Sequence, residues 1–542
     1  MKKKISNKIL ELGVSGLAAV LLGAAACALA AYYILFLSGG FITSDTVDTL
    51  LWGQASWDSG KLFNPDFGYA ALLPFGGNLL MWPLIGIFGV TVQAQVAGMF
   101  LFFLLFLAAA LFFARQMGWS TGWSAGFAGI LLMVLSSSAK LREIYWEHIL
   151  YYSLGTLFAL VGLGLFARWM DKSENGSQKG KLLTLGLLFL WCLLTGTDQM
   201  EILTLFLVPF LGAVLGERFF DIRGNLSKAG QENTWKAAAV IMAGIAGGVL
   251  LGFVLKGDMV AGYQNGYSGF SAVNKWLENA MKFPEHWFTL LGIEIKGGVT
   301  LASPGGIMIL LRLLGAVTLI AAPAAAAICY RKIEDRKLRI LILFHWMMTA
   351  LLMVGYIAGK LSASNWRLSP LVASSVILSV AFGRWLSQRA TGKRLALLAL
   401  APLVLMTMLS ASDILGINVQ EKKEQGLYQL SAELEEQGLD YGFATFWNAN
   451  GLTVVSDSRI KARGVDLTED GLKPITYQSN LQWFEDQPGQ EEYFFLLEKK
   501  EYESLEKDHP LLTASHEKIT LSQGYVALVY EENILRLITE GK

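Results

Sequence analysis

Two carboxylates three residues apart are the first candidates for chemistry in this sequence. Asp45 and Asp48 lie in Ser44-Asp45-Thr46-Val47-Asp48, directly after a long apolar run. Residues three apart share one face of a helix, so the two side chains could act on one ligand. A carboxylate there can be a general base, a metal ligand or a helix cap. We favour catalysis, with or without capping, and expect Asp45 to be the reactive group.

Residues 140–148 form a second group of ionisable side chains, with two acids, two bases, two aromatic rings and a histidine. An interfacial belt of Tyr and Trp with snorkelling charges would explain part of this segment. It suits Glu147 and His148 less well, because they begin the next apolar run, where ionisable groups are costly and usually functional. We therefore expect Arg142, Glu147 and His148 to bind substrate.

Two further turns carry charged candidates. Asp198 and Glu201 share a helical face within a short turn between apolar runs, where a structural turn and a binding site are equally compatible with the residues. Lys360 and Arg367 lie in the segment 359–370. An arginine at the start of a span can grip a phosphate with two hydrogen bonds, or can snorkel to lipid phosphates. We favour substrate binding for Asp198, Lys360 and Arg367.

The segment 257–303 mixes aromatic and amide side chains, among them Tyr263, Gln264, Asn265 and Tyr267. Rings and amides suit carbohydrate. They also suit an amphipathic helix on a lipid surface, for which residues 272–291 are the best candidate. We favour the lipid surface.

The elements that must position these side chains are membrane helices. The chain has 542 residues, of which 54% are hydrophobic and 16% charged, whereas globular proteins have about 25% charged residues. A membrane helix needs about 20 apolar residues, and the fold class is a polytopic α-helical membrane protein with about eleven spans. The predicted spans are 13–37, 93–116, 122–139, 147–168, 182–197, 200–216, 237–256, 305–329, 339–359, 368–386 and 395–412.

Three of these apolar segments have a second interpretation. The first resembles a signal peptide, but its apolar run is long enough for an uncleaved span. The fifth and sixth spans are short and could form a re-entrant pair. The run 79–90 is too short to cross a bilayer and is expected at the interface.

Charge predicts the orientation and the domain division. Lys and Arg number 22 in one set of alternate loops and 9 in the other. Because positive loops face the cytoplasm, we expect a plasma-membrane protein with its N-terminus on the cytoplasmic side. Residues 413–542 hold 12 Lys and Arg against 24 Asp and Glu. We expect a membrane domain over 1–412 and an extracytoplasmic domain over 413–542. The zero net charge of the chain gives no indication of a nucleic-acid partner.

The C-terminal domain is expected to be α/β or α+β. A helix is predicted over 420–437, and strands over 441–446, 452–456, 493–497 and 524–530. Some side chains of this domain could contact sugar, although we favour a place in the strand core: Tyr441, Phe443, Phe446, Trp447 and Asn448. The three cysteines all lie in apolar runs, so disulfides and cysteine-based metal sites are not expected.

Together these residues resemble the GT-C superfamily of membrane glycosyltransferases, which includes protein mannosyltransferases and aminoarabinose transferases. Asp45 matches the family's Asp after the first span, 45–60 and 79–90 match its interface helices, and residues 366–370 (Trp-Arg-Leu-Ser-Pro) are similar to a late family element. Leu368 stands where an aromatic residue is more usual, and Thr46 replaces the second acid of a common Asp-Glu pair. The stretch 441–450 looks like the tails of uncharacterised bacterial members.

The resemblance implies an inverting transfer of sugar from a polyprenyl-phosphate donor to a lipid, glycan or protein acceptor, with membrane lipids around the protein. Because the phosphate is a good leaving group, one base and a cationic grip suffice. Asp45 is the expected base and Arg367 the phosphate ligand, with Lys360, Arg142 or His148 assisting. The sequence leaves open whether a divalent cation takes part. The alternative is a polytopic transporter or a lipid-carrier flippase or ligase of the cell envelope.

Overall fold

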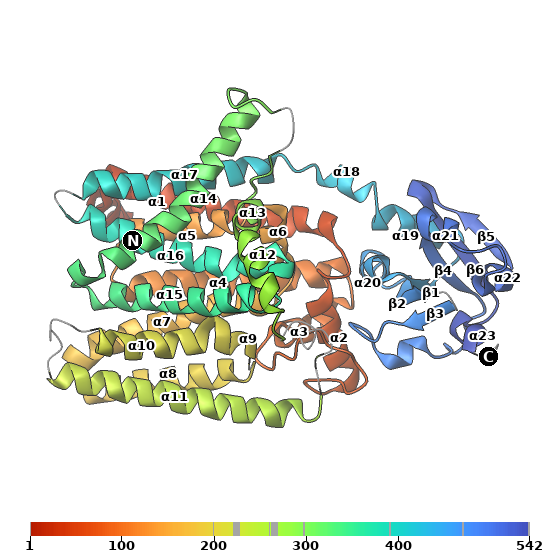
Figure 1. Cartoon of the computed structure of the whole chain (residues 1–542), viewed down its shortest axis with the longest axis horizontal. Coiled ribbons are helices and arrows are strands. Elements are labelled where there is room, and N and C mark those ends of the chain that lie inside the picture. Colours follow the sequence, from red (N-terminus) through yellow and green to blue (C-terminus); the bar gives the residue numbers. More distant parts are fainter. Residues whose placement is uncertain are drawn as a thin grey trace.

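The structure is a bundle of long helices with a sheet-containing domain at one end (Figure 1). It is a computed structural model, and it describes residues 2–198, 200–220, 228–259, 261, 269–295, 299–389, 392–468 and 471–539. The predicted carbohydrate-binding candidates Tyr263, Gln264, Asn265 and Tyr267 lie outside the described residues.

Ten helical segments in the described part of the chain are long and apolar enough to cross a membrane, and an eleventh is added if a bent pair counts as one span. The chain is therefore a multi-pass helical membrane protein, as predicted. The fifth and sixth predicted spans form two separate long segments. The long helices are α1 (Lys2–Tyr32), α4 (Val92–Gln116), α7 (Tyr151–Asn175), α8 (Gln178–Gly196), α10 (Val208–Phe219), α11 (Lys228–Lys256), α14 (Pro304–Ile328), α15 (Arg336–Ile357), α16 (Ser369–Ser387) and α17 (Lys393–Leu415).

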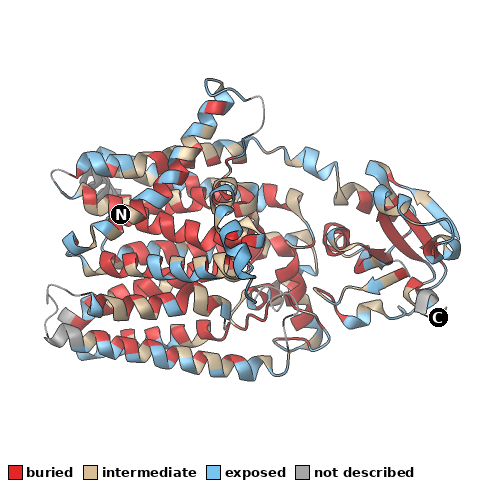
Figure 2. Ribbon diagram, in the orientation of Figure 1, coloured by how far each residue is buried: buried red, intermediate tan, exposed pale blue. Residues whose placement is uncertain are grey.

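The helices α7 and α16 form the centre of the bundle and are almost wholly buried, whereas most residues of the apolar spans in α8, α11 and α17 are exposed or only partly buried (Figure 2). Water would not tolerate so much exposed apolar surface, so lipid must cover it. Three spans are extended by short helical pieces. The pieces η1 (Tyr33–Leu37) and η2 (Ser38–Phe41) continue α1, α9 (Met200–Ile202) and η4 (Leu203–Leu207) precede α10, and η9 (Asn365–Leu368) precedes α16.

The third predicted span, 122–139, is shorter than expected. The helix α5 (Thr121–Val134) ends at a corner, and α6 (Ala139–Arg142) with η3 (Glu143–Glu147) leaves that corner at 115°. Two arginines hold the carbonyl groups of the corner, because Arg142 Nη1 donates to Ser136 O (3.0 Å) and Arg312 Nη1 donates to Ser137 O (2.8 Å). Residues 140–148 are therefore mostly buried instead of forming an open loop.

Two short helices follow α1. The helix α2 (Asp48–Ser59) packs on α3 (Gly77–Phe88), and a Cβ at Gly53 would lie only 2.7 Å from Met81 Cβ. Both correspond to the predicted helices 45–60 and 79–90. Within the predicted amphipathic segment 272–291, the structure has η6 (Val273–Lys275), α12 (Trp276–Met281) and α13 (Phe283–Leu290), with Leu277 and Met281 exposed.

The C-terminal domain is built on a six-stranded sheet in the order β3-β2-β1-β4-β6-β5, with β1 parallel to β2 and β4 and the other pairs antiparallel. The mixed sheet agrees with the predicted class. The strands are β1 (Tyr441–Ala444), β2 (Lys461–Thr468), β3 (Gly471–Pro474), β4 (Tyr493–Glu498), β5 (Glu517–Thr520) and β6 (Tyr525–Tyr530).

The predicted strand 452–456 is wrong, because this run belongs to the helix α20 (Phe446–Val455). Parallel strands need a crossover between them, and α20 is the crossover from β1 to β2. The predicted helix 420–437 is divided at Gly426 (φ +68°) into α18 (Val419–Lys423) and α19 (Leu427–Glu436). The remaining short helices of the domain are η10 (Leu481–Phe484), α21 (Lys499–Glu503), α22 (Pro510–Ala514), η11 (Ser522–Gly524) and α23 (Ile534–Thr539).

The predicted core position of two aromatic residues is confirmed. Tyr441 and Phe443 are buried in one face of the sheet, together with residues of β4 and β6. Asn448 is also buried, whereas the Trp447 side chain is 63% exposed.

Candidate functional site

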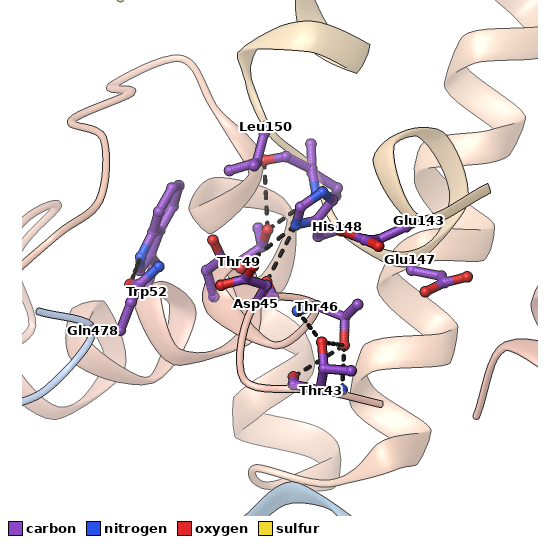
Figure 3. Close-up of polar contacts among 12 residues, drawn as sticks. Thr43, Asp45, Thr46, Thr49, Trp52, Glu143, Glu147, His148, Leu150 and Gln478 are labelled. Carbon is purple, nitrogen blue, oxygen red and sulfur yellow. Dashed lines mark hydrogen bonds and ion pairs between the residues drawn. The ribbon is translucent and has the colours of Figure 1, made fainter. Parts of the chain in front are cut away.

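Asp45, Asp48 and His148 meet where α1 leads into α2. A turn closed by the Thr43 N–H donating to Thr46 Oγ1 (2.8 Å) presents Asp45, and Asp48 is the first residue of α2. The ring atom His148 Nδ1 lies 3.2 Å from the backbone oxygen of Asp45 and 3.6 Å from Asp48 Oδ1. Figure 3 shows the His148 ring directed at this turn.

Capping does not occupy these carboxylates. Val47 is the N-cap of α2, and no side chain accepts a capping hydrogen bond there. Asp48 is buried and is the charge partner of His148, whereas Asp45 is half-buried. The two acids therefore have different environments, and Asp45 is the one that a ligand can reach.

The pKa values of this group fit a base next to a cation. Burial first, and then the charge of Asp48, raise the pKa of Asp45 to about 6. Burial alone would lower the pKa of His148, but its hydrogen bond and charge interaction with Asp48 outweigh burial and raise that pKa to about 9. Near neutral pH, Asp45 is therefore an ionised carboxylate able to accept a proton, and His148 is positively charged.

Glu147 and Arg142 belong to the buried support of this group. The Tyr33 O–H donates to Glu147 Oε1, and the Gln95 side chain donates to the backbone oxygens of Glu147 and Thr46. The Arg142 guanidinium lies 5.4 Å from the centroid of the Tyr33 ring. These contacts join η1, α4 and η3 around the turn that carries Asp45, so both predicted residues hold the site together.

Three supporting residues were not predicted: Tyr33, Gln95 and Thr49. The Ile149 N–H donates to Thr49 Oγ1 (3.0 Å), which ties α2 to the residue after His148. Gln95 has a signal in the sequence, since it is an amide at the beginning of an otherwise apolar span. Tyr33 has no comparable signal, because tyrosine is common at membrane interfaces.

Arg367 lies near the segment that follows His148. It is buried and interacts electrostatically with Tyr151 and Tyr152, the first two residues of α7. A contact chain connects it with Asp45, because Lys140 Nζ lies 4.9 Å from the Trp366 ring centroid and is also among the charges that act on Asp45. Lys140 is paired with Glu143 at 2.6 Å. Asp45 and Arg367 thus lie at the same end of the bundle.

Asp198 and Lys360 occupy separate places. Asp198 is fully buried, and its Oδ1 accepts from Phe75 N (2.9 Å). Burial raises its pKa to about 7. Lys360 is exposed and lies beside Gly269. The contact of Asp198 with Phe75 favours the structural-turn interpretation over a binding site.

An apolar cavity of about 560 Å³ is lined by Ile149, the residue after His148. It lies between α3, α4, α7 and α8, with Ile149 at the site end and Phe112 deeper in the bundle. Such a lining can take a hydrocarbon chain but offers few hydrogen bonds. Among the described residues, no group of three or more His, Cys, Asp or Glu side chains is arranged to hold a metal ion.

Comparison with solved structures identifies the fold. The sequence matches no protein-family model and no curated protein. The structure is similar to ArnT from Cupriavidus metallidurans bound to undecaprenyl phosphate, with 11% identity, a TM-score of 0.52, and coverage of 97% of this chain and 99% of ArnT. It also matches the Archaeoglobus fulgidus oligosaccharyltransferase tethered with an acceptor peptide, with 11% identity and a TM-score of 0.42.

That second match covers 83% of this chain and 64% of the oligosaccharyltransferase, so this chain spans less than two thirds of its length. The match to ArnT extends over nearly the whole of both chains, the bundle and the C-terminal domain included. The chain therefore has the fold of the GT-C glycosyltransferases, as the sequence predicted.

Proposed function

We propose that this protein is an inverting glycosyltransferase, which moves a sugar from a polyprenyl-phosphate donor to an acceptor at the outer face of the plasma membrane. The observation that carries the proposal is the half-buried Asp45 beside the His148–Asp48 pair, together with an apolar cavity that is lined by Ile149, the residue after His148. The likeness to ArnT, a structure with bound undecaprenyl phosphate, supports the same donor class.

In this mechanism Asp45 accepts the proton of an acceptor hydroxyl group. The acceptor oxygen forms a bond to the anomeric carbon from the face opposite the phosphate. The bond between that carbon and the phosphate oxygen breaks, and its electron pair leaves with the polyprenyl phosphate. One displacement inverts the anomeric centre. The pKa of about 6 at Asp45 keeps it ionised near neutral pH yet basic enough to take the proton.

Positive groups around the site stabilise the departing phosphate. Arg367 is the proposed phosphate ligand, and the positively charged His148 is the second cation. The lipid chain of the donor would lie in the cavity lined by Ile149 and Phe158, which keeps the sugar at the end of the bundle that carries Asp45. The acceptor approaches from the side of the C-terminal domain, which we propose to be extracytoplasmic with the N-terminus in the cytoplasm.

Deletion of the gene in its native host tests the proposal. Mass spectrometry of extracted lipids is expected to show one polyprenyl-phosphate sugar accumulating, and mass spectrometry of envelope glycans is expected to show one product losing that sugar. Wild-type protein restores both, and Asp45→Asn does not. A matched variant is Asp58→Asn, which removes an exposed carboxylate near the end of α2, the helix that follows Asp45, and is expected to restore both.

Two results would overturn the proposal. If Asp45→Asn restored both the lipid-linked sugar and the envelope glycan to wild-type levels, Asp45 would not be the base. Solute flux through the protein in liposomes, without any change in lipid-linked sugars after deletion, would make the protein a transporter.

A further inference from the structure

Gln478 has an unusual conformation for a buried residue of the C-terminal domain. Its φ is +55°, in the left-handed region that few residues other than glycine adopt, and its side chain is 1% exposed. Strained backbone persists only where surrounding contacts impose it, and it concentrates at functional positions. The contacts that impose it here come from both parts of the protein.

The backbone around Gln478 pairs with the loop between α2 and α3. The Gln478 N–H donates to Gly68 O (2.6 Å), and the Gly68 N–H donates to Ser479 O (3.0 Å). No side chain fits at residue 68, because a Cβ there would lie 1.8 Å from Thr476 O. From inside the C-terminal domain, Asn450 Nδ2 of α20 donates to Gln478 O (3.1 Å).

The side chain of Gln478 reaches α2 itself. Its Oε1 accepts from Trp52 Nε1 (2.6 Å), a contact visible in Figure 3. Trp52 is buried and lies one helical turn after Asp48 in α2. A contact that fixes Trp52 therefore also fixes Asp48.

The same domain also holds the chain just before Asp45. Ser44 Oγ donates to the backbone oxygen of Phe446 (2.5 Å), and the Gly451 N–H donates to Ser44 Oγ (3.4 Å). Both partners belong to α20. The two carboxylates therefore lie between two contacts with the C-terminal domain, at Ser44 and at Trp52.

We propose that Gln478 is a positioning residue, through which the C-terminal domain fixes α2 and so sets where Asp45 and Asp48 stand relative to His148. The inference rests on the proposed function, since it assigns the domain a part in that reaction. A catalytic group displaced by about 1 Å can lose roughly a hundredfold in rate. Loosening one of several contacts is expected to cost less.

The test uses full-length protein and the polyprenyl-phosphate sugar that accumulates in the deletion strain. Gln478→Asn suits the left-handed backbone but withdraws the amide by one carbon from Trp52. Trp52→Phe removes the donor of the same hydrogen bond. Each variant is expected to lower kcat about tenfold with KM for the donor within about twofold, and the double variant is expected to lose no more than either single variant.

Tyr530→Phe is the matched control, because it removes an equally buried hydrogen bond (Tyr530 O–H to Leu511 O, 2.9 Å) elsewhere in the domain. It is expected to keep wild-type kcat. If Gln478→Asn does not fold, Trp52→Phe alone carries the test, with its melting temperature compared with that of Tyr530→Phe.

Three outcomes would overturn the inference: kcat within twofold of wild type in both single variants, losses that multiply in the double variant, or an equal loss in Tyr530→Phe. A failure of the proposed function is recognised separately. In that case Asp45→Asn keeps full turnover, whatever Gln478→Asn does.

Discussion

Two acidic side chains at the same end of the bundle, those of Asp45 and Asp198, have similar chemistry and different environments. Asp198 is fully enclosed, and one of its oxygens accepts from Phe75 N. Asp45 is half-buried, and a histidine that is paired with another acid approaches its backbone. Burial raises the pKa of both carboxyl groups. A raised pKa alone therefore does not distinguish a reactive carboxylate from a structural one, whereas access to the carboxylate does.

The largest difference is expected from the same substitution at the two positions. Asp45→Asn should lower kcat about a hundredfold or more, because general-base catalysis contributes at least that much. Asp198→Asn should leave kcat within about threefold, since an amide oxygen can still accept from Phe75 N. Turnover of the donor by both purified variants measures this. Equal losses at the two positions would abolish the distinction.

Arg367→Lys is expected to lower kcat/KM roughly tenfold, because lysine keeps the charge but loses the two-pronged grip on phosphate. Arg459→Lys is a control, since Arg459 forms an exposed ion pair with Glu435 in the C-terminal domain. Donor titration of the two variants gives the comparison. Unchanged kcat/KM in Arg367→Lys would leave Arg367 without a role in phosphate binding.

The pH profile of activity tests how the charges around Asp45 act on it. These charges are Asp48, His148, Glu143 and Lys140. Activity should rise as pH passes about 6, where Asp45 ionises, and fall above about 9, where His148 loses its proton. Asp48→Asn removes a charge that raises the pKa values of both Asp45 and His148. The acid limb and the alkaline limb of the pH–activity profile should therefore both move to lower pH. The alkaline limb should move further, because Asp48 dominates the rise at His148. Limbs that stay in place would contradict this assignment.

The smallest effect is expected on stability at Asp198. Its pKa of about 7 in the folded protein lies above the ordinary value of 3.8, so the folded state binds the proton more tightly than the unfolded state. The contribution of Asp198 to the free energy of unfolding therefore falls as pH rises from about 4 to about 7. Asp198→Asn should melt a few degrees higher than wild type at pH 8, with no gain at pH 4. A gain that is independent of pH would exclude this cause.

Hydropathy predicted most of the fold, because lipid requires long apolar runs and these are visible in any window of the sequence. It did not predict the corner after α5, since that bend depends on Arg312, far away in the chain, and on its bond to Ser137 O. The helix α20 was mistaken for a strand, because a short, fully buried apolar run has no distinctive period.

The candidate site was predictable only in part. Asp45, Asp48 and His148 stood out because charges at the edge of apolar runs are costly. Glu147 and Arg142 stood out for the same reason, but their contacts with Tyr33 and Ser136 O show that they hold the corner and the turn together. Gln478 had no signal at all, because a glutamine in a polar segment is ordinary until the partner that it contacts is known.

If the proposed function is right, the short length of α5 sets the depth in the membrane at which the sugar is transferred. Its 14 residues rise about 21 Å, against a hydrocarbon layer of about 30 Å. The corner at Ser136 and the segment that carries His148 are thus expected to lie below the level of the lipid headgroups. A sugar held there would be shielded from bulk water, which favours transfer over hydrolysis, and an acceptor would have to extend a hydroxyl group down into the membrane to receive it.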